Sequence, residues 1–331
     1  MERAGQRCDH PNMKAAIYTK SSDVVQITDV EKPIPHDDEV LIRVRAASVN
    51  PLDSHLGKHA FLRRILKVTR PGRDVAGEVE AAGSKVTQFK RGDRVFGACR
   101  AAFAEYACAS ESNLAAKPDN VTFEQAASVP VAALTALQGL RDKGRIQPGQ
   151  QVLINGAAGG VGTFAVQIAR SFGANVTGIC STRNVEMVQS IGAAHVIDYS
   201  QEDFTKSGQH YDLIFDLVSN HSLSACRRVL HPRGIYIGAG ALGRESMIDI
   251  ASRLLKVLVL PWFISQKLLT FTAKLSKEDL SILSELMATG RVRPVIDRCY
   301  SLSEVAEAIR YLGERHARGK VVITLEADNK T

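Results

Sequence analysis

A glycine-rich stretch near the middle of the chain is the clearest place where residue types and spacing could support chemistry. Residues 152–162 read VLINGAAGGVG, with Gly156, Gly159 and Gly162 at three-residue intervals. Small residues there allow a tight turn, close approach of the backbone to a pyrophosphate, and close packing of the next helix on the strand. Free N–H groups at the helix start would hold the phosphates. Glycines also form ordinary turns, but the flanking strand, helix and second strand predict a dinucleotide site.

The end of the second strand indicates which dinucleotide would bind. A site for NAD usually places a carboxylate there to bind the ribose 2′-hydroxyl, but this sequence has none before Glu186. Ser181, Thr182 and Arg183 instead offer two hydroxyl groups and a guanidinium to a 2′-phosphate, which favours NADPH. The alternative is a surface arginine at a strand end. Tyr199, after the third strand, would either add a hydroxyl to the same phosphate or pack at the sheet edge.

Two sequence patterns indicate the elements that must position these residues. Up to about residue 126, short β-branched runs alternate with turn signals, which predicts antiparallel strands. An alanine-rich helical stretch follows from Thr122 to Leu140, and strands then alternate with helices, which predicts an α/β fold with a doubly wound parallel sheet. The last segment is too short to fold alone and is expected to rejoin the first. We expect a disordered extension at residues 1–12, a β-rich domain at 13–127 and 291–331, and a cofactor domain at 128–290.

Composition argues against several other functions. With 331 residues, 45% of them apolar, the chain can form two cores. Its 42 basic and 35 acidic residues give a net charge of +7, but the basic residues are dispersed and only 6% of residues are aromatic, so no nucleic-acid binding is expected. The six cysteines form no CxxC pair, so neither disulfides nor structural zinc are predicted. A reducing, cytoplasmic setting is expected.

Neither the N-terminus nor the most apolar segment predicts export or membrane insertion. Residues 1–12 are polar and lack the apolar core of a secretory signal. Residues 254–264 contain Lys256 and Pro261 and fall short of the roughly 20 apolar residues that a spanning helix needs. We expect residues 254–271 to border the cleft or a subunit interface, or to pack in the core.

Five segments make the sequence resemble a known family, the medium-chain dehydrogenase/reductases. Within it, the sequence is most similar to the zinc-free quinone-oxidoreductase branch that includes zeta-crystallin and the reticulon-4-interacting protein. The resemblance runs from Lys14 to Leu325 and implies a Rossmann domain inserted in a GroES-like catalytic domain, with the active cleft between them; a homodimer is also expected. The segments are AASVNPLD at 46–53, PGRDVAG at 71–77, AGGVG at 158–162, GAAHVIDY at 192–199 and HARGKVV at 316–322.

The same resemblance implies which residues contact NADPH. It assigns the backbone of the glycine-rich turn, two side chains after the second and third strands, and the loops at Val218 and at 238–240. Together with the residues identified above, the predicted cofactor site comprises Ala158, Gly159, Gly160, Val161, Gly162, Ser181, Arg183, Tyr199, Val218 and Gly240.

The resemblance also predicts that no metal takes part. Zinc-bearing alcohol dehydrogenases of the superfamily carry a cysteine where this chain has Asn50 and a His-Glu pair where it has Arg73 and Asp74. These replacements cannot form a Cys/His zinc set, and the cysteine-rich lobe that holds a structural zinc is missing. Without a Lewis acid, alcohol oxidation is poorly supported.

Reduction of a quinone or an α,β-unsaturated carbonyl fits better, because the carbon that receives hydride is already electron-poor. The candidate catalytic residues are Asn50, Asp53 and Thr135. Asn50 would donate a hydrogen bond to the acceptor oxygen, and Asp53 would organise water or ribose hydroxyls. The alternatives are a turn at Asn50-Pro51 and a helix cap at Asp53. Thr135 resembles a residue that lies under the nicotinamide in this family, with a packed core threonine as the alternative.

One departure from the family concerns the proton donor. Some relatives aim a tyrosine at the substrate soon after the Asn-Pro-x-Asp segment, but residues 54–61 read SHLGKHAF. Protonation is therefore expected from water, with His55 or His59 as alternatives. The leading hypothesis is an NADPH-dependent quinone or enone reductase. The alternatives are an NADPH-binding structural or regulatory protein with incidental turnover, and a zinc-type alcohol dehydrogenase, which the missing ligands disfavour.

Overall fold

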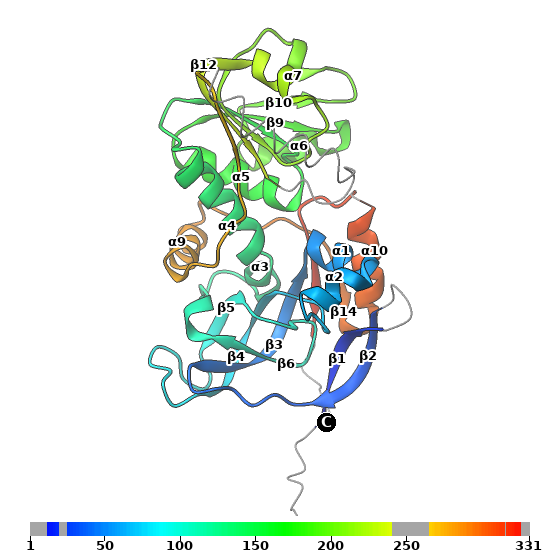
Figure 1. The fold of residues 1–331 in the computed structure, drawn as a ribbon. Helices are drawn as coiled ribbons and strands as arrows, with labels where there is room; N and C mark the ends of the chain where they lie inside the picture. Colours follow the sequence, from blue (N-terminus) through cyan, green and yellow to red (C-terminus); the bar gives the residue numbers. More distant parts are fainter. Residues whose placement is uncertain (1–11, 20–24, 240–264, 315, 326–331) are drawn as a thin grey trace, which may run out of the picture.

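The polypeptide forms two lobes, each built around its own sheet (Figure 1). The structure, a computed structural model, describes residues 12–19, 25–239, 265–314 and 316–325. One lobe contains a six-stranded sheet, and the other a seven-stranded sheet and a two-stranded one. The functional pocket described below lies where the two lobes meet.

The six-stranded sheet has the strand order β10-β9-β8-β11-β12-β13, and all of its neighbouring strands are parallel. Its central strands carry short apolar runs that are buried on both faces, as parallel strands covered by helices require. This sheet confirms the predicted doubly wound α/β fold. The strands are β8 (Gln151–Asn155), β9 (Asn175–Cys180), β10 (His195–Asp198), β11 (Tyr211–Asp216), β12 (Leu230–Gly238) and β13 (Lys267–Thr270).

Among the described residues, three helices cover the parallel sheet, and the helices at residues 123–138 and 277–288 contact strands of the seven-stranded sheet. The helical stretch predicted for residues 122–140 is divided into α3 (Phe123–Ala127) and α4 (Pro130–Gln138). Pro130 has no backbone N–H and cannot continue a preceding helix, but it fits the first turn of a new one. The last turn, Gly139–Lys143, is a π-helix. The others are α5 (Gly160–Ser171), α6 (Val185–Ser190), α7 (Leu223–Arg228) and α9 (Lys277–Ala288), with short 3-10 turns at Thr182–Asn184 and Phe204–Lys206.

The seven-stranded sheet brings both ends of the chain together. Its order is β14-β15-β3-β4-β5-β7, and β6 also pairs with β3. The last strand, β15, pairs antiparallel with β3, with Val321 opposite Val49. The strands are β3 (Glu39–Val49), β4 (Asp74–Ala82), β5 (Arg94–Ala98), β6 (Tyr106–Ser110), β7 (Leu114–Ala116), β14 (Ile296–Ser301) and β15 (Lys320–Thr324), with 3-10 turns at Glu111–Asn113 and Leu302–Glu304.

The remaining elements lie around this sheet. Strands β1 (Asn12–Tyr18) and β2 (Val25–Glu31) form an antiparallel pair. Helices α1 (Pro51–Lys58) and α2 (Ala60–Ile65) lie beside α10 (Val305–Gly313) in Figure 1. The extension predicted for residues 1–12 is one residue too long, because Asn12 already pairs with Glu31 in the β1–β2 ladder. Residues 1–11 lie outside the described part.

One of the buried hydrophobic clusters extends across the boundary between the lobes. Ala46, Ala76 and Phe96 of the seven-stranded sheet belong to the same buried cluster as Leu137 of α4 and Phe164 of α5. Phe96 and Phe164 are completely buried. This shared core fixes the lobes relative to one another, and so fixes the geometry of the pocket between them.

The apolar segment predicted near residues 254–271 is described only in its last part. Residues 254–264 lie outside the described residues, so the prediction for them stays a prediction. From residue 265 onward the chain forms β13, and Leu269 and Phe271 pack against the shared core. None of the helices in the described segments has the length and apolar character needed to cross a membrane.

Candidate active site

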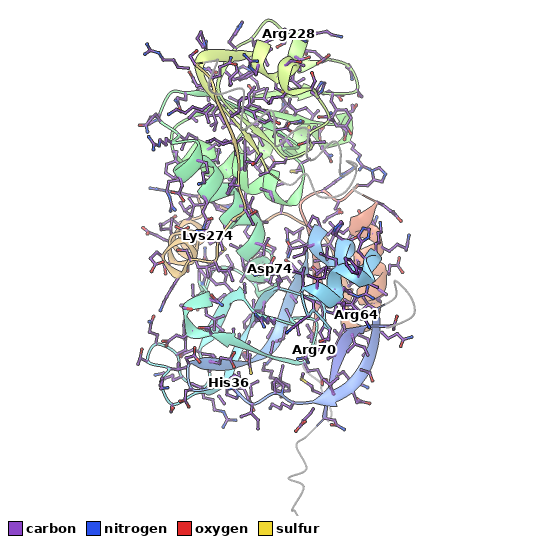
Figure 2. The ribbon with its side chains drawn as sticks, in the orientation of Figure 1. His36, Arg64, Arg70, Asp74, Arg228 and Lys274 are labelled. Carbon is purple, nitrogen blue, oxygen red and sulfur yellow. The ribbon has the colours of Figure 1, made fainter. Side chains whose placement is uncertain are left out.

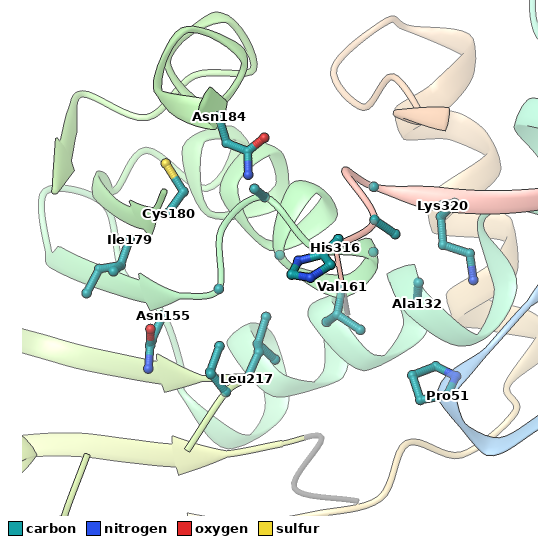
Figure 3. Close-up of a pocket in the computed structure, with 18 of the residues that line it drawn as sticks. Pro51, Ala132, Asn155, Val161, Ile179, Cys180, Asn184, Leu217, His316 and Lys320 are labelled. Atoms are coloured by element: carbon teal, nitrogen blue, oxygen red, sulfur yellow. The ribbon is translucent and has the colours of Figure 1, made fainter. Parts of the chain in front are cut away.

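A pocket of about 570 Å³ lies between the lobes, at the carboxyl ends of β8 and β11. These adjacent strands mark the point where the strand order of the sheet reverses, which is where doubly wound proteins bind ligands. Figure 3 shows His316 in the middle of the pocket, between Cys180 and Asn184 on one side and Lys320, Pro51 and Ala132 on the other. We call these the Ser181 end and the Asn50 end, after residues that line them.

The glycine-rich turn forms one wall of the pocket, and its shape depends on the absence of side chains. Gly156 has φ = +91°, which favours glycine. A Cβ atom on Gly162 would lie 2.0 Å from the carbonyl oxygen of Gly156, so only glycine lets α5 pack this closely on the turn. The pocket is also lined by Ala158, Gly159, Gly160 and Val161, so the structure places all five predicted residues of the turn on it.

The C-terminal segment holds this turn from the other lobe. The N–H of Gly319 donates to the carbonyl oxygen of Ala158 at 2.8 Å, and Gly319 forms a parallel bridge with Gly159. Gly319 has φ = +88°, and a Cβ atom there would lie 2.3 Å from the carbonyl oxygen of Val295. The next residue, Lys320, therefore starts β15 directly beside the turn.

Ser181, Arg183 and Tyr199 all line the Ser181 end, and their binding to a phosphate stays a prediction. Arg183 is exposed, and its Nη2 donates to the carbonyl oxygen of His316 at 3.0 Å. Tyr199 is 58% exposed, so its ring does not pack at the sheet edge. The Thr182 hydroxyl, which is expected from the sequence to face a 2′-phosphate, has a different partner. It donates to Oδ2 of Asp198 at 2.5 Å, which directs it away from the pocket.

Asn184 adds a polar atom that the sequence reasoning missed. Its Nδ2 donates to Ser181 Oγ at 3.1 Å, and its buried Oδ1 has no hydrogen-bond partner although Asn184 lines the pocket. A buried polar atom without a partner is costly unless a ligand or water pairs with it. The Ser181 end therefore has the features of a site for a polar ligand.

The loop after β11 closes the pocket beside the turn. Asp216 is buried, and its Oδ1 accepts hydrogen bonds from the N–H groups of Val218 and Ser219 and from Asn155 Nδ2, at 2.8 to 3.1 Å. These bonds present Val218 to the pocket, where the sequence placed it. Gly240, the other predicted loop residue, lies outside the described residues.

Asn50 lines the pocket, but its amide is already fully engaged. Its Nδ2 donates to Asp74 Oδ2 at 2.9 Å and to the carbonyl oxygen of Ser48 at 3.4 Å, and its Oδ1 accepts from Lys320 Nζ at 2.8 Å. The predicted donation to an acceptor oxygen would require one of these N–H bonds to break. The geometry therefore makes Asn50 part of a larger buried network.

That network, which we call the Lys320 cluster, consists of Ser48, Asn50, Asp74 and Lys320. Asp74 is completely buried, and its Oδ2 also accepts from Ser48 Oγ at 2.9 Å, with Lys320 Nζ at 3.5 Å. Its Oδ1 accepts the N–H of Val131 at 3.1 Å, at the start of α4. Figure 2 places Asp74 near the junction of the lobes. Burial lowers the pKa of Lys320, and attraction to Asp74 opposes this effect.

Asp53 does not line the pocket, and its contacts differ from the predicted ones. Its Oδ2 accepts the N–H of Asn50 at 2.9 Å in a capping box for α1, and its Oδ1 accepts the N–H of Gly72 at 3.0 Å. The helix-cap alternative therefore describes it. Burial raises the pKa of Asp53 to about 6. Thr135 does line the pocket, and its hydroxyl donates to the carbonyl oxygen of Val131 at 2.7 Å, which leaves its lone pairs for a ligand.

Within the described segments, no group of three or more His, Cys, Asp or Glu side chains is arranged to hold a metal ion. The prediction that no zinc takes part rests on Asn50, Arg73 and Asp74, which stand where zinc-bearing alcohol dehydrogenases carry a cysteine and a His-Glu pair. Asn50 and Asp74 are hydrogen-bonded to each other in the Lys320 cluster.

A doubly wound sheet has a glycine-rich turn at its switch point, and a pocket separates it from a mostly antiparallel sheet. This arrangement defines a two-domain dehydrogenase or reductase. Comparison with known families agrees. Residues 36–119 match the alcohol dehydrogenase GroES-like domain, and residues 191–323 match the family described as zinc-binding dehydrogenase. The chain belongs to the medium-chain dehydrogenase/reductase family, in its quinone-oxidoreductase-like branch, and is an oxidoreductase of that family.

Individual relatives cover most of the chain. It is 34% identical to the 2-methylene-furan-3-one reductase of Solanum lycopersicum, over 94% of this chain and 79% of the relative. It is 32% identical to the mitochondrial NAD(P)H oxidoreductase RTN4IP1 of Mus musculus, over 88% and 83%. The solved quinone oxidoreductase of Coxiella burnetii is 31% identical and superposes with a TM-score of 0.85, over 96% of this chain and 100% of that one.

Proposed function

We propose that this protein is a zinc-independent, NADPH-dependent oxidoreductase that reduces a quinone or an α,β-unsaturated carbonyl compound. The observation that carries this proposal is the asymmetry of one pocket. A glycine turn and the Ser181, Arg183 and Tyr199 side chains form one end, and amide and ammonium groups form the other. Relatives named for quinone and furanone reduction support the class of acceptor.

The residues present fit an NADPH molecule. The first residues of α5 line the pocket, and their N–H groups, which have no partner within the helix, would bind the pyrophosphate. Arg183 would exchange the His316 carbonyl for the 2′-phosphate, with the hydroxyl groups of Ser181 and Tyr199 beside it. The unpaired Asn184 Oδ1 is an acceptor, so it would pair with a donor of the bound nucleotide such as a ribose hydroxyl, not with the phosphate.

At the other end the protein orients the acceptor. A bound NADPH supplies the hydride. Thr135, Ala132 and Pro51 form walls that hold the acceptor against the nicotinamide site, and such positioning is a large part of what an enzyme contributes to hydride transfer. The Lys320 cluster contributes the polar groups, and water protonates the product. Because the acceptor is conjugated, this chemistry needs hydrogen-bond donors and positive charge rather than a metal.

The test is an acceptor screen with the purified protein, using NADPH and NADH side by side. The acceptors are ortho- and para-quinones, enones, and the saturated ketone matched to each enone. We expect turnover of quinones or enones but not of saturated ketones. NADPH should be preferred over NADH by about 10- to 100-fold, since a charge-assisted hydrogen bond contributes about 1.5 to 3 kcal/mol. Tight NADPH binding without turnover of any acceptor would instead favour a structural or regulatory role, and stoichiometric zinc in the purified protein would favour the zinc-type enzyme.

Several predictions accompany this proposal and are tested separately. The division into residues 13–127 with 291–331 and residues 128–290 can be checked by limited proteolysis. A homodimer is expected from light scattering in solution. A cytoplasmic setting stays a prediction, to be checked by fractionation of the source cells.

A further inference from the structure

Lys320 is placed differently from the other basic side chains of the pocket. Among the described residues that line the pocket, it is the only lysine, and it is 3% exposed, whereas Arg183 and His316 are exposed. Its side chain passes the glycine turn, since a Cβ atom added to Gly160 would lie 3.0 Å from Lys320 Cδ. The ammonium then ends 2.8 Å from Asn50 Oδ1. The charge therefore lies at the Asn50 end of the pocket, beyond the turn.

The contacts of this ammonium leave it able to bind a ligand. Only the bond to Asn50 is short; the carbonyl oxygen of Val49 lies at 3.3 Å and Asp74 Oδ2 at 3.5 Å. Asp74 Oδ2 already accepts closer bonds from Ser48 and Asn50, both at 2.9 Å. Two of the three N–H groups of Lys320 are therefore weakly bound and can turn toward a stronger acceptor in the pocket.

Stability alone does not explain why this charge is buried here. A buried ion pair often stabilises a protein no more than apolar side chains of similar size, because both charges lose their hydration. A buried ammonium beside a ligand pocket is, however, suited to stabilise negative charge that appears on a ligand, since water does not screen it.

We propose that the Lys320 ammonium, held in place by Asn50 and Asp74, stabilises the negative charge that develops on the acceptor oxygen during hydride transfer. This inference rests on the proposed function. As the hydride forms a C–H bond at the electron-poor carbon, the π electrons shift onto the oxygen, which Lys320 binds as an anion. NADPH is oxidised to NADP⁺ and the acceptor is reduced. Lys320 keeps its proton, and water protonates the product.

The test compares the wild-type protein with Lys320→Met and with the double variant Lys320→Met/Asp74→Asn. The single variant leaves Asp74 as an unpaired buried charge and is expected to lose stability. The double variant removes both charges, so its melting temperature should return toward that of the wild type. We expect kcat of the double variant to stay about 100-fold or more below wild type, as when one oxyanion donor is removed, with its dissociation constant for NADPH close to the wild-type value.

A second measurement separates a direct role from a structural one. An enolate oxygen is more basic than a hydroquinone oxygen, so an enone needs more stabilisation than a quinone. Both variants should therefore lose more kcat with enones than with quinones, whereas a purely structural defect would reduce both equally.

Two results would overturn the inference while leaving the proposed function intact. Wild-type kcat in the double variant would mean that Lys320 only neutralises Asp74. A large loss of NADPH affinity with kcat retained would mean that Lys320 binds the cofactor phosphates. Absence of turnover by the wild-type protein with every acceptor is a different outcome, and it would overturn the proposed function itself.

Discussion

The two ends of the pocket are built in opposite ways. At the Ser181 end, the groups that face a ligand are backbone N–H groups and exposed side chains such as Arg183 and Tyr199. At the Asn50 end, the polar groups are buried side chains that hydrogen-bond to one another, with Asp74 and Ser48 both at 0% exposure. Ligand binding at the Ser181 end therefore depends on the shape of the backbone, whereas the structure of the Asn50 end depends on a balance of buried charges.

This difference predicts how each end responds to substitution. A surface side chain at the Ser181 end can change without loss of the fold, so substitutions there should alter specificity. A side chain in the Lys320 cluster is part of the core, so substitutions there should alter stability and rate together. The four predictions that follow test this contrast, in order of expected size.

The largest effect is expected for Asp74→Ala. The change leaves the Lys320 ammonium buried without its counter-charge, and it removes the acceptor for Ser48, Asn50 and the N–H of Val131. We expect the free energy of unfolding to fall by about 3 to 5 kcal/mol, measured by denaturant titration. The control is Glu78→Ala on the same strand, because Glu78 pairs with Arg45 near the surface and should contribute about 1 kcal/mol or less. Similar losses in the two variants would contradict the idea of a buried charge balance.

The next largest effect is expected for a substitution in the glycine-rich turn. In Gly162→Ala the new Cβ atom would lie 2.0 Å from the Gly156 carbonyl oxygen and 2.8 Å from Ala157 Cα, so the turn must move. We expect a loss of about 3 kcal/mol in unfolding free energy, together with loss of NADPH binding. Gly159→Ala is the matched control, because its Cβ atom would come no closer than 3.4 Å and its φ of −81° suits alanine. Its cost should be about 1 kcal/mol or less.

A smaller and more selective effect is expected at Arg183. Reversing its charge in Arg183→Glu should weaken NADPH binding by about 30-fold, or about 2 kcal/mol, and leave NADH binding nearly unchanged. Fluorescence titration with each cofactor measures this difference. Arg228→Glu makes the same charge change on α7, at the end of the molecule away from Asp74 in Figure 2. Arg228 does not line the pocket, so this change should affect neither cofactor. Equal weakening of both cofactors by Arg183→Glu would show that the 2′-phosphate lies elsewhere.

The smallest effect is a pH dependence at Asp53. Its pKa is about 6 in the folded protein against 3.8 when unperturbed, so the folded state binds its proton more tightly. The resulting stabilisation is present at low pH and is lost as the pH rises through about 6. From about pH 5 to about pH 7.5 the wild type should lose about 1 kcal/mol that Asp53→Asn does not lose. Urea titrations of both proteins at the two pH values measure this difference. An equal change in unfolding free energy in the two proteins would argue against a raised pKa of Asp53.

The same contrast explains which parts of the site could be predicted from the sequence. The glycine turn is local, and the spacing of Gly156, Gly159 and Gly162 between a strand and a helix is enough to indicate it. Arg183 and Tyr199 follow strands of the same sheet, so their convergence at one end of the pocket follows from the alternating pattern. Most strands of both sheets could be predicted for the same reason, because their apolar runs are short and bounded by turns. The short strands β7 and β13 were missed.

The Lys320 cluster could not be found in this way. It joins residues 48, 50, 74 and 320, and nothing local distinguishes a lysine before the apolar run VVIT from an ordinary strand-edge lysine. The family resemblance pointed to Asn50 and Asp53 as individual residues, but it did not show that Asn50 has no free N–H or that Asp53 caps α1. Hydrogen-bond partners depend on long-range packing, which a single sequence does not encode in its spacing.

The pairing of β15 with β3 also sets an order of events during synthesis. Residues 130–290, which contain the parallel sheet, are contiguous and can fold as soon as they leave the ribosome. The seven-stranded sheet has to wait, because β3 needs a neighbour that is translated about 270 residues later. Until β15 arrives, the Asp74 carboxylate has no ammonium beside it and the glycine turn has no Gly319 partner. The nascent chain should therefore gain its cofactor lobe first, and its capacity to reduce an acceptor only when the last strand is in place.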